Sequence, residues 1–194
     1  MSFYNFAKGL VKGLFKIIYK IEVEGINYIP EEGRAILCAN HMSNLDPIIL
    51  AIVCPRPISF MAKKELFSNK IFAKLLHSLN AFPVDRQGSD ISAIRKSLEV
   101  LKNEELLGIF PEGTRITNMD MNSAKPGIAM IGLKSKSPII PIFIDSEYKL
   151  FGKVKVNIGS PIYLDNYYEK KLRTDDYKKI SVRILESIYS LKND

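Results

Sequence analysis

The stretch AILCANHMSNLDPIILAIV, residues 35–53, shows the pattern that decides the fold class. AILCAN is an apolar run of strand length, which indicates a strand that is buried on both faces. DPIILAIV is typical of a short helix, with Asp46 expected as its N-cap and Pro47 in the first helical position. A buried strand, a polar turn and a helix in this order form the repeating unit of α/β proteins.

The same alternation of strand and helix patterns continues along the chain. Apolar residues recur at helical spacing in six segments, 3–21, 46–53, 64–79, 89–103, 127–136 and 174–191. Short apolar or alternating runs are expected as strands, at residues 21–26, 35–40, 58–63, 81–86, 106–110, 138–144 and 153–162. Pro141 lies inside one of these runs, where a proline indicates an edge strand or the start of a strand. The sequence therefore predicts an α/β fold with a mixed, largely parallel central sheet flanked by helices.

Length and composition suit a single globular domain. The chain has 194 residues, of which 46% are hydrophobic and 25% are charged. Its 28 Lys and Arg against 21 Asp and Glu give a net charge of +7, which favours anionic partners. Nucleic acid is not expected among them, because the basic residues are scattered and do not alternate with aromatic residues along a strand.

Two cysteines and two histidines limit the metal and redox chemistry that is expected. Cys38 and Cys54 lie in apolar stretches, so we expect buried free thiols in a reducing compartment. The four residues lack the spacing of a zinc site, and neither a metal nor another cofactor is expected. His77 is expected to be structural or exposed. The chain lacks a run of about 18 apolar residues and a signal-peptide pattern, so we expect no spanning helix and a cytoplasmic location.

Residues 3–21 have the pattern of a basic amphipathic helix. Lysines recur every four residues and share an arc about 120° wide, namely Lys8, Lys12, Lys16 and Lys20. Apolar side chains gather on the opposite side, among them Phe3, Phe6, Leu10 and Leu14. Such a helix can lie in a membrane surface with its lysines at anionic head groups. It can equally pack its apolar side on the domain, and the pattern alone does not separate these two readings.

The polar turn NHMSNLD brings His41 and Asp46 within five residues of each other. In open α/β sheets, ligands bind beyond the carboxyl ends of strands, where this turn is expected. A histidine there can act as a general base near neutral pH, and a neighbouring aspartate can hold its ring in one tautomer. The other reading is a helix-capping aspartate beside a loop histidine. Spacing alone slightly favours that reading, because five residues on a continuous helix put two side chains about 140° apart.

Two further segments have charged side chains directly after short apolar strands. In FPEGTR, residues 110–115, Gly113 allows close approach of the backbone to a ligand, with Glu112 and Arg115 nearby. The carboxylate suits hydroxyl groups and the guanidinium suits phosphate. In FPVDRQG, Arg86 follows a strand in the same way. Taken alone, the first segment is equally well explained by a turn with a surface ion pair, and the second by a solvated arginine.

These segments occur in the order in which a known enzyme family has them. NHMSNLD resembles the N-H-x4-D block of the glycerolipid acyltransferases, the group of 1-acyl-sn-glycerol-3-phosphate (PlsC-like) acyltransferases. FPVDR looks like the second block of that family, FPEGTR the third, and the proline-centred IIPIFI the fourth. The blocks run in family order across residues 40 to 142, about half of the chain. One departure is Ile116, where many members have a serine, and it leaves the exact acceptor open.

The resemblance implies an acyltransferase domain over residues 22–194 and a direct acyl transfer. His41 would take the proton from the free hydroxyl of a lysophosphatidate-like acceptor, which then attacks the thioester of acyl-coenzyme A or acyl carrier protein. Asp46 would orient His41, and Ser43 is not expected to be a nucleophile. Arginines would hold the phosphate, and the expected substrate-binding residues are Arg86, Glu112, Gly113, Thr114, Arg115 and Lys125.

An acceptor with a long acyl chain resides in a bilayer, so the resemblance favours the membrane reading of residues 1–21. It implies a protein bound to the cytoplasmic face of the cell membrane, with phosphatidic acid, a precursor in phospholipid biosynthesis, as product. Two alternatives stay open. One is an acyltransferase for another lyso-lipid, such as a lysophospholipid or lyso-ornithine lipid, and the other is a non-catalytic basic membrane-binding module.

Overall fold

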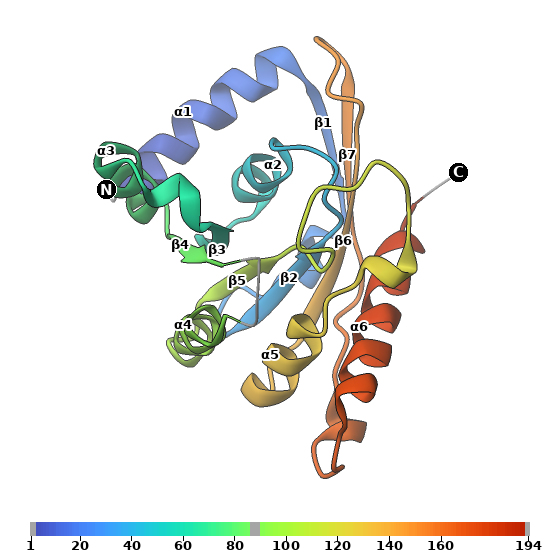
Figure 1. The fold of residues 1–194 in the computed structure, drawn as a ribbon. Coiled ribbons are helices and arrows are strands. Elements are labelled where there is room, and N and C mark those ends of the chain that lie inside the picture. The colour runs from blue at the N-terminus through green and yellow to red at the C-terminus, as the bar shows by residue number, and fades with distance from the viewer. Residues whose placement is uncertain (1–2, 86–89, 193–194) are drawn as a thin grey trace.

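The computed structural model describes residues 3–85 and 90–192, and in this part a central sheet has helices on both faces (Figure 1). The strands are β1 Lys20–Glu24, β2 Ala35–Ala39, β3 Ile58–Lys63, β4 Ala81–Val84, β5 Leu106–Ile109, β6 Ile139–Asp145 and β7 Lys153–Ile158. The α-helices are α1 Phe3–Ile18, α2 Asp46–Val53, α3 Lys70–Ser78, α4 Ile91–Lys102, α5 Gly127–Ser135 and α6 Thr174–Tyr189. Short 3-10 helices are η1 Ile26–Tyr28, η2 Lys64–Phe67, η3 Met121–Ser123 and η4 Asp165–Tyr167.

The strands form one sheet in the order β1-β7-β6-β2-β5-β3-β4. From β6 to β4 all neighbours are parallel, whereas β7 is antiparallel to β6 and parallel to β1. The predicted α/β fold with a mixed, largely parallel sheet is confirmed. Strands β2 to β6 therefore all end at one edge of the sheet, which we call the carboxyl edge, and β1 and β7 begin at this same edge.

The core has two layers, one on each face of the sheet. Alternate residues of β2 point to opposite faces: Ile36 packs in the layer of α4, α5 and α6, and Leu37 packs in the layer of α1 and α2. In each layer, fully buried helix residues pack against the sheet, such as Leu185 on one face and Leu50 on the other. Burial on both faces explains why β2 reads as one continuous apolar run.

Several predicted element ends differ from the structure. Helix α1 ends at Ile18 instead of residue 21, and Lys20 begins β1, so this lysine is not on the helix. The helix expected over 64–79 is divided into η2 and α3, because the Asn69 side chain accepts hydrogen bonds from the first N–H groups of α3 and starts a new helix there. Asp90 caps α4 in the same way.

Pro141 occupies an interior strand, so the prediction of an edge strand or strand start was wrong. Strand β6 lies between β7 and β2, and Pro141 is its third residue. Its carbonyl faces β7 and accepts the Gly159 N–H, one residue beyond the end of β7. The pairing of β7 with β6 ends there, at Ile158 and Ile142, so a missing N–H at Pro141 interrupts no regular ladder bond.

Cys38 and Cys54 are buried and are not joined in a disulfide, as expected. Within the described ranges, no helix combines the length and the apolar character that crossing a bilayer requires.

Candidate active site

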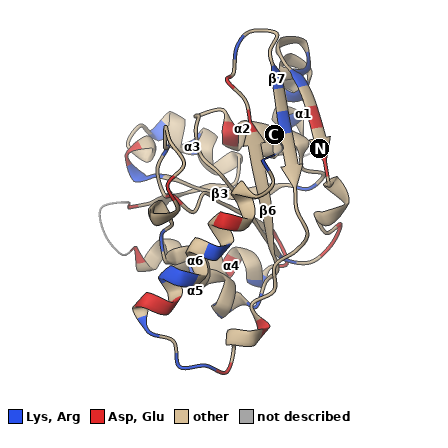
Figure 2. Ribbon diagram, turned by 90° about the vertical axis from the view of Figure 1, so that its right-hand side faces the viewer, with Lys and Arg blue, Asp and Glu red and all other residues tan. Residues whose placement is uncertain are grey.

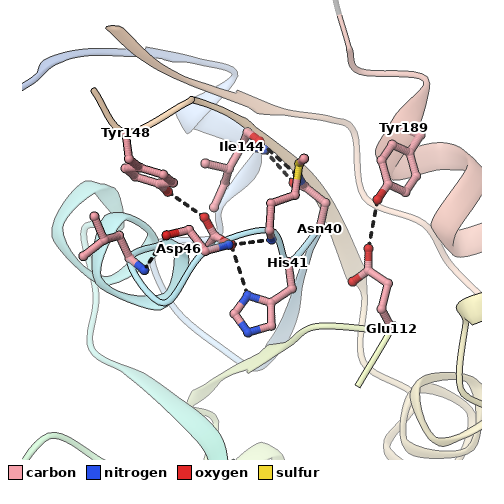
Figure 3. A network of polar contacts seen from close by, with 10 residues as sticks. Asn40, His41, Asp46, Glu112, Ile144, Tyr148 and Tyr189 are labelled. Carbon is pink, nitrogen blue, oxygen red and sulfur yellow. Dashed lines mark hydrogen bonds and ion pairs between the residues drawn. The ribbon is translucent and has the colours of Figure 1, made fainter. Parts of the chain in front are cut away.

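The turn after β2 holds His41 and Asp46 against each other at the carboxyl edge (Figure 3). His41 Nδ1 lies 3.0 Å from Asp46 Oδ2, and both side chains are buried. The same oxygen accepts the backbone N–H groups of Met42 and Ser43, each at 2.7 Å. Because an ionised carboxylate only accepts hydrogen bonds, this contact puts the ring proton on Nδ1. The opposite nitrogen, Nε2, is then able to accept a proton from a substrate.

Asp46 holds this position in a way that differs from the predicted helix cap. It is the first residue of α2, Leu45 stands at the N-cap position, and Pro47 follows in the first turn. The carboxylate reaches backward to the N–H groups of Met42 and Ser43. The prediction of Asp46 as N-cap was therefore wrong, and the dyad is held by the turn that precedes the helix.

A tyrosine that the sequence did not reveal completes the bonding of Asp46. The Tyr148 hydroxyl, from the segment between β6 and β7, donates to Asp46 Oδ1 at 2.6 Å across 102 residues of sequence. Burial, and next the negative charge of Asp46, raise the pKa of Tyr148 well above its usual value, which keeps the hydroxyl a donor. Both oxygens of Asp46 are thereby hydrogen-bonded, which fixes the orientation of the carboxylate toward His41.

Asn40 is the second residue whose role the sequence did not indicate. It is fully buried, its Oδ1 accepts the Ile144 N–H at 2.7 Å, and its Nδ2 donates to the Ile144 carbonyl at 3.0 Å. Main-chain pairing of β2 with β6 ends one step earlier, at Ala39 and Ile142. The amide side chain thus replaces the next ladder bonds, so the backbone can leave the sheet at this point and form the turn that carries His41.

The segment after β5 packs directly on this turn. The Phe110 ring stacks on the His41 imidazole, with centroids 4.3 Å apart and planes inclined by 24°. The Ile116 N–H donates to the His41 carbonyl at 2.9 Å. The structure therefore brings FPEGTR and NHMSNLD together at the carboxyl edge, as their placement after parallel strands suggested.

Three of the predicted substrate-binding side chains are exposed. Thr114 and Arg115 belong to the segment after β5, and Lys125 belongs to the segment before α5. The Lys125 N–H donates to the Pro111 carbonyl at 2.7 Å, which joins the two segments. Gly113 has a φ of 70°, and a Cβ there would meet the Lys125 side chain at 3.2 Å. Glycine thus provides both the left-handed backbone and the room for the lysine stem.

Glu112 has a different environment from the predicted one. It is fully buried, and Figure 3 shows its carboxylate pointing to Tyr189 of α6 and away from the imidazole. Tyr189 donates to Oε1 at 3.0 Å, and Oε2 has no hydrogen-bond partner among the described residues. Burial raises the pKa of Glu112 to about 7, although the Tyr189 hydroxyl acts to lower it. The predicted contact with substrate hydroxyls is not supported by this geometry, which makes Glu112 a link between the site and α6.

Helix α1 has two apolar sides, one packed on the domain and one exposed. Tyr4 and Phe15 are buried against the domain. The exposed side carries Phe3, Phe6, Leu10, Leu14 and Ile17, which we call the α1 stripe. Lys8 is half-buried and donates to the Cys54 carbonyl, so it differs from the predicted solvent-facing lysine, whereas Lys12 and Lys16 are exposed.

The remaining predictions concern single residues. Arg86 lies outside the described residues, although β4, which precedes it, ends at the carboxyl edge. The His77 ring contacts the Phe67 ring, with centroids 5.0 Å apart. These two residues belong to α3 and η2, and not to the turn that carries the dyad. In the part of the chain that the structure describes, no group of three or more His, Cys, Asp and Glu side chains is placed to hold a metal ion.

Comparison with known proteins shows which family the chain belongs to. A sequence model named Acyltransferase matches residues 20–145. The 1-acyl-sn-glycerol-3-phosphate acyltransferase of Bacillus subtilis is 34% identical over 166 residues, which cover 82% of each chain. The chain belongs to the 1-acyl-sn-glycerol-3-phosphate acyltransferase family. The Streptococcus pneumoniae protein of the same name is 33% identical over 191 residues, 94% of this chain and 70% of the relative.

A solved acyltransferase of the family has the same fold. The crystal structure of the 1-acyl-sn-glycerophosphate acyltransferase PlsC from Thermotoga maritima superposes with a TM-score of 0.69 over 98% of this chain and 83% of that one, at 22% identity. The acyltransferase match at residues 20–145 includes the dyad and FPEGTR, and it leaves α1 and α6 outside.

Proposed function

We propose that this acyltransferase moves a fatty acyl group from an acyl thioester to the free hydroxyl of 1-acyl-sn-glycerol 3-phosphate and forms phosphatidic acid. The observation that carries this proposal is the buried His41–Asp46 dyad, with Nδ1 bonded to the carboxylate and FPEGTR packed beside it. The names of the Bacillus subtilis and Streptococcus pneumoniae relatives support the acceptor. The donor is acyl-coenzyme A or acyl carrier protein.

His41 acts as the general base through Nε2. As it takes the proton from the acceptor hydroxyl, the hydroxyl oxygen attacks the thioester carbonyl and a tetrahedral intermediate forms. When the intermediate collapses, the carbon–sulfur bond breaks and the imidazolium returns the proton to the leaving thiolate. Asp46 holds the ring in the tautomer that leaves Nε2 unprotonated and stabilises the transient imidazolium. The acyl group passes directly between substrates, so Ser43 carries no covalent intermediate.

The acceptor phosphate is held by the exposed cations beside the dyad. Arg115 directly precedes Ile116, whose N–H is bonded to the His41 carbonyl, and this supports a role for its guanidinium in binding a substrate at Nε2. A guanidinium can bind two phosphate oxygens at once, and Lys125 adds a second positive charge. The resemblance to the family adds Arg86 to the proposed phosphate-binding residues.

The α1 stripe holds the enzyme on an anionic leaflet. Its side chains project away from the domain, whereas Tyr4 and Phe15 fix the helix from the other side. An exposed row of large apolar side chains beside Lys12 and Lys16 has the composition of a helix that lies in a membrane interface. This placement gives the dyad access to an acceptor that remains in the bilayer.

The decisive experiment is acyl transfer to lysophosphatidate, measured with palmitoyl-coenzyme A and separately with acyl carrier protein. We expect His41→Ala and Asp46→Asn to reduce turnover, the first by at least about 100-fold. Full activity of His41→Ala would refute the mechanism, whereas no acyl transfer by the wild type would favour a non-catalytic membrane module. Activity toward uncharged lyso-lipids alone would refute the assigned acceptor.

Two further variants test the binding roles. Arg115→Ala should raise the KM for lysophosphatidate and leave the KM for the acyl donor nearly unchanged. Leu10→Ser with Leu14→Ser should weaken binding to anionic vesicles while the free energy of unfolding stays close to that of the wild type, since both side chains are exposed. Vesicle binding that is unaffected by this double substitution would contradict the role of the α1 stripe.

A further inference from the structure

The segment between β6 and β7, residues 146–152, exposes two large apolar side chains. Leu150 is 70% exposed and Phe151 is 74% exposed. Phe151 has a φ of 60°, in the left-handed region that favours glycine, and the turn is closed by the Gly152 N–H bonded to the Lys149 carbonyl at 2.8 Å. A bulky apolar side chain that is both exposed and backbone-strained is unfavourable in water on two grounds, which is typical of a functional contact surface.

Topology puts this β6–β7 turn beside the active site. Strand β6 ends at the carboxyl edge and β7 begins there, so the turn lies at the same edge as the dyad. The Phe151 N–H donates to the Ile18 carbonyl at 2.8 Å, which joins the turn to the last residue of α1. Figures 1 and 2 both show the turn and the end of α1 projecting together from the top of the molecule. Its two apolar side chains therefore extend the α1 stripe beyond Ile17.

The charges around this extended surface are mainly positive. The exposed lysines on α1, in the turn and at the adjoining strand ends are Lys12, Lys16, Lys20, Lys149 and Lys153. The carboxylates near them are fewer: Glu22, Asp145 and Glu147. Glu22 pairs with Lys20 and Lys153, and Glu147 pairs with Lys149, so Lys12 and Lys16 supply the excess charge. An apolar turn beside a helix that carries the excess of cations is complementary to an anionic bilayer surface.

We propose that the β6–β7 turn is a second lipid-contacting element, which inserts Leu150 and Phe151 into the bilayer on which the α1 stripe lies. The tip is convex, so it suits a deformable apolar phase better than a shaped protein pocket. The choice of lipid as occupant rests on the proposed function, since the acceptor is itself a lipid. Tyr148 in the same turn donates to Asp46, so a turn seated in the bilayer sets the dyad directly at the lipid surface.

Vesicle binding of the full chain tests the proposal. Leu150→Ser with Phe151→Ser should reduce the partition onto phosphatidylcholine–phosphatidylglycerol vesicles by about 10- to 100-fold, because two large apolar side chains lose their insertion. The matched control is Tyr163→Ser, a 63% exposed aromatic residue next to Ile162, which pairs with the start of β6 at the opposite edge. This control should bind as the wild type does. Wild-type binding by the double variant, or no binding by the wild type, would overturn the proposal.

A fluorescence reporter gives a second, position-specific measurement. The chain has no tryptophan, so Phe151→Trp places a single tryptophan at the turn, and its emission can be excited separately from that of the nine tyrosines. With the same vesicles its emission should move to shorter wavelength and become protected from an aqueous quencher, whereas Tyr163→Trp should stay accessible. Equal quenching of the Phe151→Trp protein with and without vesicles would overturn the proposal.

Both measurements omit the acyl donor and the acceptor, so their outcomes do not depend on whether the chain transfers acyl groups. Conversely, turnover of a short-chain lysophosphatidate dispersed in water should be the same for the double Ser variant and the wild type. The two proposals can therefore fail separately.

Discussion

The buried carboxyl group of Glu112 gives the protein a pH-dependent stability that one substitution should remove. Its pKa is raised from 4.5 to about 7, first of all by burial. Between these two pH values the folded chain keeps a proton that the unfolded chain has lost. The contribution is fully present below pH 4.5 and is lost as the pH rises to about 7. At about 1.4 kcal/mol for each pH unit, the free energy of unfolding falls by about 3 kcal/mol across this window.

Glu112→Gln keeps the size of the side chain and removes the titration. The difference in free energy of unfolding between this variant and the wild type should therefore grow by about 3 kcal/mol from pH 4.5 to pH 7 and stay constant above it. Urea unfolding of both proteins, followed by circular dichroism across this range, measures the difference and cancels all other titrations. Two curves that run parallel would refute the reasoning.

A second variant locates the effect at this carboxyl group. Tyr189 donates to Glu112 and acts to lower its pKa, so Tyr189→Phe should raise that pKa further. The loss of stability with rising pH should then extend to higher pH than in the wild type. In the double variant Glu112→Gln with Tyr189→Phe, this extension should be absent.

Two more substitutions test residues around the dyad. Tyr148→Phe removes the donor to Asp46, so we expect kcat to fall about tenfold with little change in KM for either substrate; steady-state kinetics that match the wild type would show that Asp46 needs no such partner. Asn40→Ala leaves the buried N–H and carbonyl of Ile144 unpaired, which should lower the free energy of unfolding by about 2–4 kcal/mol in urea titrations. A loss below about 1 kcal/mol would contradict the bridging role of Asn40.

The sequence predicted the dyad through the resemblance of NHMSNLD to a family block, since spacing alone slightly favoured a helix cap, and it predicted the class of sheet through local apolar patterns. His41 and Asp46 are five residues apart, and one turn brings them together. The strands that carry the site are parallel and have the continuous apolar runs of strands buried on both faces. Parallel strands also end at one edge, so FPEGTR and NHMSNLD had to meet there.

The remaining parts of the site depend on contacts that no local pattern encodes. Tyr148 reaches Asp46 because β6 pairs with β2 and ends at the carboxyl edge, where the chain turns into the antiparallel strand β7. The direction of Glu112 depends on the backbone of a turn whose next residue, Gly113, has a φ of 70°. The pattern of α1 showed one apolar side and one basic side, but it could not show that Tyr4 and Phe15 would face the protein.

The amide bridge of Asn40 also makes the integrity of the site observable without any substrate. The Ile144 N–H donates to the side chain of Asn40, the residue that precedes His41, and both Ile144 and Asn40 are buried. Its exchange with deuterium requires β2 and β6 to separate where the catalytic turn leaves the sheet. The rate of that one amide therefore reports how often the catalytic turn opens, and it should respond to a ligand that tightens the site.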